Sequence, residues 1–120
     1  MYQCEELKAR TKRFAIEIIK LFRKLPKTDD SRIIGKQVLR SATSVAANYR
    51  SACRARSKAE FISRIGIVVE EIDETVFWLE IIFETDIYKS DPIEKLLKEA
   101  NELLAIFAAS QYTAKSRGNR

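Results

Sequence analysis

The sequence predicts an all-α protein, an antiparallel up-down-up-down four-helix bundle. The 120 residues include only three Gly and two Pro, too few for the many turns of an all-β chain. Four segments carry apolar residues at helical spacings of three and four, separated by short polar breakers. No segment is typical of a strand. We therefore expect one domain over residues 1–115, followed by a frayed tail over residues 116–120.

The first helix is predicted over residues 4–24, where one apolar stripe runs from Leu7 to Leu25. Pro26 ends it, because the residue before a proline avoids the α region. The second helix is predicted over residues 31–55, and small side chains on its apolar side would let a neighbouring helix approach closely. The residue expected to cap it is Asp29, Asp30 or Ser31.

The third helix is predicted over residues 57–84, beginning at the sequence SKAE. This tetrapeptide fits a capping box, in which the Ser57 hydroxyl accepts the Glu60 amide and Glu60 reaches back. The fourth helix begins at SDPIE, and its apolar stripe continues to Ala108. Its expected cap is Ser90 or Asp91, with Pro92 as the first helical residue.

The composition argues against most catalytic chemistry. The chain has no His, which removes the commonest general base and metal ligand. Cys4 and Cys53 have no CxxC spacing and are not expected to form a disulfide framework. The charged N-terminal sequence and the lack of a long apolar run predict a cytoplasmic protein without a membrane segment. No nucleotide-binding or hydrolase motif occurs, so we expect no enzyme, metal or cofactor.

The third predicted helix has more apolar residues than one stripe needs. The surplus residues lie on two sides of the helix that are rotated away from its main stripe. One interpretation is that this helix is buried more deeply than its neighbours. The other is self-association, because exposed apolar patches mark interfaces and Trp is typical of their centres. The predicted interface consists of Ile67, Phe77, Trp78, Ile81 and Ile82.

Basic residues gather on one side of the second predicted helix. Five of them fall within a sector of about 80° and extend over about 33 Å at 1.5 Å per residue. No acid lies between Ser31 and Lys58, so no pair within the helix is expected to neutralise the row. Two further cations continue it into the next connection. The predicted nucleic-acid-binding residues are Arg32, Lys36, Arg40, Arg50, Arg54, Arg56 and Lys58.

Two interpretations of this row stay open. The cations pair with the acidic third and fourth helices, or they follow the phosphates of RNA or DNA. The net charge of +5 and a pI near 9.3 favour the second. Because Tyr49 points to the core, no base stacking is expected, and binding should be salt-dependent with little sequence readout. Asn48 lies in a neighbouring polar strip and is expected to bond a facing helix or the following connection.

The stretch LRSATSVAANYRSACRARSKAEF resembles the signature region of the 23S rRNA-intervening-sequence family of small four-helix-bundle proteins. An Ala-Asn element near the end of the second helix leads through an Arg-Ser connection into a Glu-Phe pair. Many members carry a Glu and glycines after the Asn, where this chain is more basic. The matching residues are Arg40, Ser44, Ala47, Asn48, Arg56, Ser57, Glu60 and Phe61.

The resemblance implies an antiparallel bundle that commonly assembles as a ring-like pentamer. Related bundle proteins act as accessory factors that bind nucleic acid and a reverse transcriptase. Our first hypothesis is a non-enzymatic homo-oligomer that presents its basic stripe to RNA or DNA, with avidity multiplying weak contacts. The second is a scaffold whose partner is a protein, with no nucleic-acid binding. The sensitivity of nucleic-acid binding to salt distinguishes the two.

Overall fold

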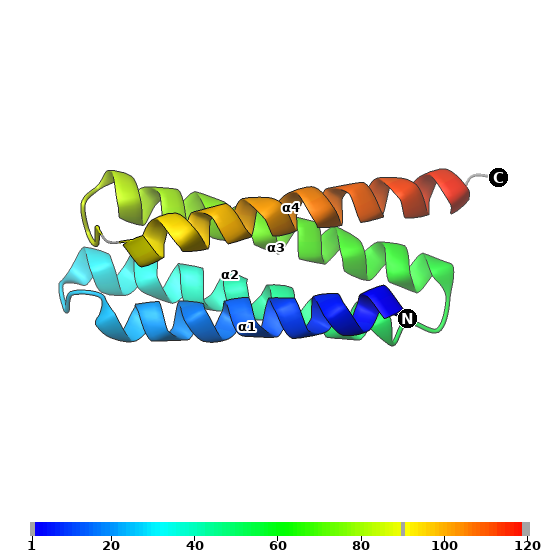
Figure 1. The fold of residues 1–120 in the computed structure, drawn as a ribbon, viewed down its shortest axis with the longest axis horizontal. Helices are drawn as coiled ribbons and strands as arrows, with labels where there is room; N and C mark the ends of the chain where they lie inside the picture. Colours follow the sequence, from blue (N-terminus) through cyan, green and yellow to red (C-terminus); the bar gives the residue numbers. More distant parts are fainter. Residues whose placement is uncertain (1, 90, 119–120) are drawn as a thin grey trace.

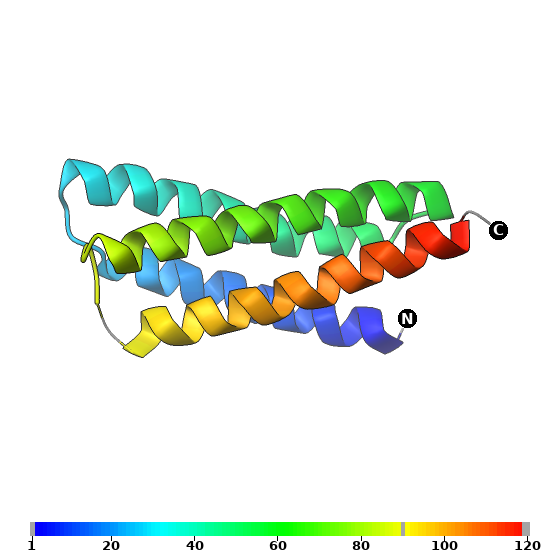
Figure 2. The ribbon, with the colours of Figure 1, turned by 90° about the horizontal axis from the view of Figure 1, so that it is seen from above.

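The computed structural model describes residues 2–89 and 91–118, which form four long helices. Successive helices run in opposite directions and are joined by short connections (Figures 1 and 2). The bundle measures 51 × 22 × 20 Å. All four helices match the predicted segments, and the all-α bundle is confirmed. Their bounds are α1 Tyr2–Lys24, α2 Asp29–Cys53, α3 Lys58–Glu84 and α4 Asp91–Gly118.

The start of α2 differs from the prediction. Thr28 is the N-cap residue, and both aspartates expected as caps already lie in the first turn. The Asp30 carboxylate accepts hydrogen bonds from the Thr28 hydroxyl at 2.6 Å and from the Ser31 amide at 2.7 Å. Acids are favourable in a first turn because they face the exposed amides of the helix N-terminus. The helix therefore begins two residues earlier than its apolar pattern indicates.

The end of the chain also differs from the prediction. The tail expected to fray continues α4 as a helix through Gly118, and residues 119–120 lie outside the described part. Lys115 and Arg117 lie in its last turn, where cations interact favourably with the helix dipole. At the other end, α4 begins at Asp91, followed by Pro92. The alternative cap, Ser90, lies outside the described residues.

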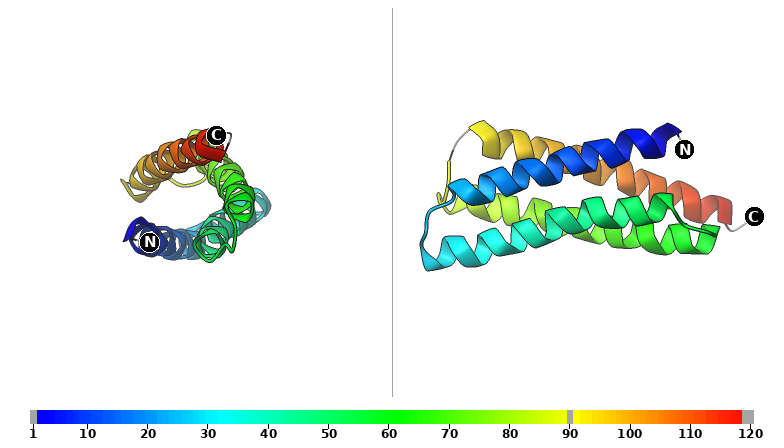
Figure 3. Two further views of the ribbon diagram at one scale, coloured as in Figure 1. Left: turned by 90° about the vertical axis from the view of Figure 1, so that its right-hand side faces the viewer. Right: turned by 90° about the horizontal axis from the view of Figure 1, so that it is seen from below.

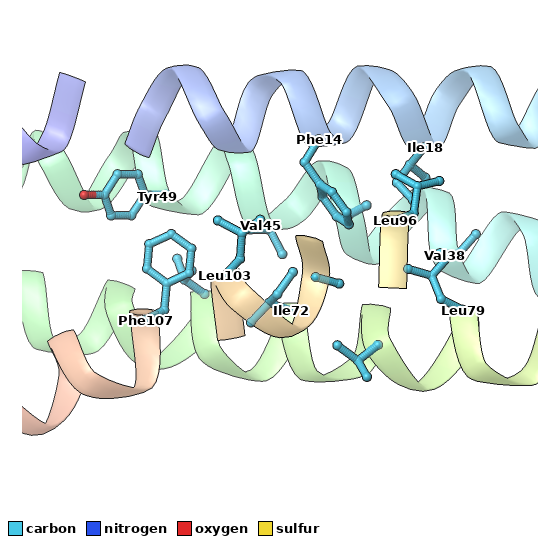
Figure 4. Close-up of a cluster of buried hydrophobic side chains, with 14 of the residues drawn as sticks. Phe14, Ile18, Val38, Val45, Tyr49, Ile72, Leu79, Leu96, Leu103 and Phe107 are labelled. Atoms are coloured by element: carbon cyan, nitrogen blue, oxygen red, sulfur yellow. The ribbon is translucent and has the colours of Figure 1, made fainter. Parts of the chain in front are cut away.

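One apolar core runs the length of the bundle, with every helix contributing (Figure 4). Phe107 is fully buried and its ring lies 4.9 Å from that of Tyr49, whose side chain faces the core as predicted. Burying each large apolar side chain contributes about 1.5–3 kcal/mol, so this core is the main source of stability. Its labelled members in Figure 4 are Phe14, Ile18, Val38, Val45, Tyr49, Ile72, Leu79, Leu96, Leu103 and Phe107.

The helices pack in sequence order, α1 on α2, α2 on α3 and α3 on α4, with few contacts between α1 and α4 (Figure 3). At this last junction Arg10 of α1 donates to both carboxylate oxygens of Glu99, at 2.7 and 2.8 Å, and to Glu102 at 2.9 Å. These acids raise the pKa of Arg10 above its ordinary value. Beside this clamp, α1 and α4 border a groove of about 620 Å³.

The two cysteines correct the sequence prediction. Cys4 near the start of α1 and Cys53 at the end of α2 form a disulfide, with Cα atoms 5.9 Å apart. The Tyr49 hydroxyl lies 3.7 Å from the Cys4 sulfur. Residues 49 apart in sequence meet here because α1 and α2 are antiparallel neighbours. The bond ties the first turn of α1 to the bundle.

We expect reduction of this disulfide to lower the free energy of unfolding by about 2–4 kcal/mol, because it closes a long loop in the unfolded chain. Urea unfolding with and without dithiothreitol measures the change. A Cys53→Ser variant serves as the control and should be insensitive to the reductant. Equal stability of oxidised and reduced wild type would contradict this expectation.

Candidate nucleic-acid interface

The structure exposes all seven cations predicted to bind nucleic acid. Arg32, Lys36 and Arg40 lie on the first half of α2, whereas the other four lie in its last turn, in the connection and at the first residue of α3. The two groups differ in their acidic neighbours, and this difference decides which of them is available to a phosphate.

In the first half of α2, two of the three cations are paired. Arg32 contacts Asp29 at 2.9 Å, so the prediction that no pair within this helix neutralises the row was wrong. The error follows from the helix start, because Asp29 lies in the helix one turn before Arg32. Arg40 contacts Glu71 of α3 at 3.1 Å and also pairs with Glu74. For Arg40, pairing with the acidic third helix is the correct interpretation.

The Arg40 cluster extends to Trp78, whose indole N–H donates to Glu74 at 2.9 Å. The bond from Trp78 and the pairing with Arg40 together hold the pKa of Glu74 below its ordinary value. The Glu74 hydrogen bond, and then Glu71, raise the pKa of Arg40. The cluster thus links α2 to α3 and keeps one member of the predicted stripe occupied.

The last cations of the row carry no ion pair within the described part of the chain. The last turn of α4 lies at the same end of the bundle (Figure 1). There Arg117 and Lys58 line a shallow groove of about 630 Å³ between the ends of α4 and α3. Arg117 is absent from the predicted set, because residues 116–120 were expected to fray. We call this group the basic end: Arg50, Arg54, Arg56, Lys58 and Arg117.

The backbone beneath the basic end is held by a defined cap. The Ser57 hydroxyl accepts the Glu60 amide at 3.1 Å, as predicted. The Glu60 carboxylate reaches back to the Arg56 amide at 2.8 Å, one residue beyond the Ser57 amide of a standard capping box. Phe61 follows and packs partly buried against the core. A fixed turn therefore presents the cationic side chains to solvent.

The polar strip of α2 contacts different partners from those predicted. Asn48 donates to the Ser44 carbonyl and hydroxyl, both at 2.9 Å, within its own helix and not across to a neighbour. Ser41, another member of this strip, makes its hydrogen bond to a neighbouring helix: its buried hydroxyl accepts from Thr75 of α3 at 2.8 Å. Thr75 is a polar residue inside the apolar pattern of α3. That position could have indicated a buried hydrogen bond to a neighbouring helix.

The predicted interface residues of α3 divide into exposed and buried members. Phe77 is 49% exposed, and Ile67, Trp78 and Ile81 are half-buried. Ile82 is fully buried within the bundle, so its predicted place in an oligomer interface was wrong. Both α2 and α4 pack against α3 and cover a wider sector than one stripe. The helix is therefore buried over a wider sector than one stripe, and it still exposes an apolar residue, Phe77.

Within the described residues, no three Asp, Glu or Cys side chains gather as metal ligands. None of the four helices combines the length and the apolar character that crossing a bilayer requires.

We expect Arg40→Gln to lower the free energy of unfolding at pH 7 by a few tenths to about 1 kcal/mol, the range of partly exposed ion pairs. Because the folded pKa of Glu74 is lowered from 4.5, its contribution is present above that value and is lost as the pH falls through the folded pKa. The difference from wild type should therefore shrink in acid. Urea unfolding across a pH series measures it.

Lys36→Gln is the matched control, since Lys36 is exposed on the same helix without an ion-pair partner among the described residues. It should leave stability unchanged at every pH. A loss in Arg40→Gln that is the same at neutral and acidic pH would contradict the assignment of the pair.

Comparison with known proteins places this bundle in a family. A family model described as 23S rRNA-intervening sequence protein matches residues 5–109. A crystal structure from Bacteroides thetaiotaomicron, described as a protein with unknown function from the S23 ribosomal protein family, is 31% identical. The match covers 87% of this chain and 96% of that one, with a TM-score of 0.79. No curated protein matches. The chain belongs to the 23S rRNA-intervening sequence protein family.

Proposed function

We propose that this protein is a non-enzymatic, homo-oligomeric bundle that binds the phosphate backbone of RNA or DNA at its basic end. The observation that carries the proposal is the set of exposed cations without acidic partners in the described part of the chain, four of them from a short connection and its flanks. Arginine suits this role because its guanidinium contacts phosphate oxygens through two parallel hydrogen bonds.

The proposed binding surface covers only part of the predicted basic stripe. Arg40 is held by two glutamates of α3, and Arg32 by Asp29, so neither meets a phosphate without giving up a partner. Lys36 is exposed but stands apart from the basic end by several turns of α2. Backbone binding therefore centres on the end of the bundle and lacks sequence readout.

Self-association would strengthen weak phosphate contacts at the basic end. The exposed Phe77 ring, which lies 4.9 Å from the Trp78 ring, indicates a surface for another copy. Several basic ends in one assembly would bind one nucleic acid with avidity. The family resemblance implies a pentamer, and a pentamer would carry five basic ends.

The second candidate function is a scaffold for a protein partner. Phe77 favours it as well, because an exposed aromatic residue serves a foreign partner as readily as a second copy. In that case the chain binds no nucleic acid at any salt concentration.

The location proposed for the protein is the cytoplasm, where thiols are kept reduced. There we expect Cys4 and Cys53 as a thiol pair beside Tyr49, with the disulfide forming in purified, air-exposed protein.

We expect Arg50→Glu/Arg54→Glu to weaken binding of a short RNA duplex at least about tenfold at low salt, since two phosphate contacts are lost and two repulsions gained. Fluorescence anisotropy measures the affinity. The slope of log affinity against log salt should fall by about 2. Both side chains are exposed and make no hydrogen bond within the described part of the chain, so the fold should be kept.

Lys95→Glu/Lys98→Glu is the matched control, because it makes the same change of charge at exposed positions near the start of α4. It should change the affinity by less than about threefold. Equal loss in both variants would make net charge the cause and overturn the basic end as the site. If the wild-type protein binds neither RNA nor DNA at low salt, the nucleic-acid proposal is wrong and the scaffold function is favoured.

We expect light scattering to give wild-type protein a mass several times that of the 13.8 kDa chain, and a pentamer would give 5 × 13.8 = 69 kDa. Trp78→Ala should lower the mass, because Trp78 supports the exposed Phe77 ring. If the wild-type protein has the mass of one chain at micromolar concentration, the proposed oligomer is wrong.

A further inference from the structure

The outward side of α3 is an acidic surface with an aromatic centre. Phe77 is 49% exposed and lies between exposed carboxylates before and after it on the helix. The sequence has no Lys or Arg between Arg64 and Lys89, so nothing along this helix neutralises them. They have no ion pair in the part of the chain that the structure describes. We call this surface the acidic face: Glu70, Asp73, Phe77, Glu80 and Glu84.

The outward side of α1 has the opposite charge and also an apolar centre. Ile16 is 43% exposed, and cations lie one turn before it, one turn after it and two turns after it. Lys20 lies 3.7 Å from Glu17, whereas Lys12 and Arg23 have no partner among the described residues. We call this surface the basic face: Lys12, Ile16, Lys20 and Arg23.

The two faces lie on opposite sides of one bundle. Helices α1 and α3 lie diagonally across the bundle, because each of them packs against α2 or α4 and not side by side with the other (Figure 3). They run in the same direction (Figures 1 and 2). Phe14 and Ile72 lie at one level of the core and Ile18 and Leu79 at the next (Figure 4). Ile16 and Phe77 therefore stand at similar heights on opposite outer sides.

We propose that the basic face of one copy packs against the acidic face of the next, with Ile16 meeting Phe77 between the charges. This contact rests on the proposed homo-oligomer and names the surfaces that form it. Opposite charges around an apolar centre make the faces complementary to each other. Neither face is complementary to itself, because a two-fold contact would place carboxylate against carboxylate or cation against cation.

The contact is therefore head-to-tail. Every copy has one face of each kind on opposite sides, so it joins two neighbours and leaves the basic end outside the contact. Because the two apolar centres stand at similar heights, successive copies join side by side without a large shift along the bundle axis. Such a series closes into a ring when the rotation between copies permits, and otherwise forms a filament.

Reversing the charge of each whole face tests the contact independently of which residues meet. The basic-face variant carries Lys12→Glu, Lys20→Glu and Arg23→Glu. The acidic-face variant carries Glu70→Lys, Asp73→Lys, Glu80→Lys and Glu84→Lys. All seven positions are exposed, and circular dichroism with thermal unfolding confirms that each variant keeps the fold. Light scattering gives the mass.

Each variant alone is expected to fall to the 13.8 kDa mass of one chain, and one chain carrying both sets of changes is expected to regain the wild-type mass. Lys95→Glu/Lys98→Glu on α4 is the control and should assemble as wild type does.

Three results would overturn the proposal. If either face variant keeps the wild-type mass, the contact lies elsewhere while the oligomer stands. If both variants are monomers but the combined chain is a folded monomer, the faces do not pair with each other. If wild-type protein is itself a monomer, the proposed oligomer fails together with this contact.

Discussion

The close packing of α2 against α3 is the interaction on which the rest of the bundle depends. Ser41 and Ala42 are fully buried on α2, and their small side chains bring the two helices close enough for the Thr75–Ser41 hydrogen bond at 2.8 Å. In turn α1 packs against α2, and α4 packs against α3. The same proximity brings Arg40 to two glutamates of α3. Packing at the centre thereby decides which cations stay available outside it.

The fold followed from the sequence because its signals are local. Apolar spacing gave four helices, Pro26 ended the first, and Ser57 with Glu60 marked the start of the third. The errors concern contacts between distant residues or small shifts of a boundary. The disulfide Cys4–Cys53 depends on how two helices align, and the Arg32–Asp29 pair depends on where α2 begins. Burial of Ile82 depends on two neighbours covering α3, which its own periodicity does not reveal.

The sequence predicted which cations are exposed, but not which of them pair with acidic residues. All seven predicted cations are exposed, yet their acidic partners could be assigned only once the helices were placed. Arg40 differs from Arg50 because α3 presents carboxylates beside the middle of α2 and none of them pairs with its last turns. The surface carries a basic end and two faces of opposite charge on α1 and α3, to which we assign, as proposals, phosphate binding and contact between copies. Because these regions do not overlap, the proposed assembly would leave the basic end accessible.

Footprinting of lysine and arginine side chains tests the central claim most directly, namely that nucleic acid contacts the basic end and no other basic surface. Mass spectrometry would compare the rate at which each side chain is modified in free and RNA-bound protein. The account predicts that RNA slows the modification of Arg50, Arg54, Arg56 and Lys58, while Lys95 and Lys98 react at unchanged rates. Equal protection of all exposed cations, or protection of α4 without the α2–α3 connection, would contradict it.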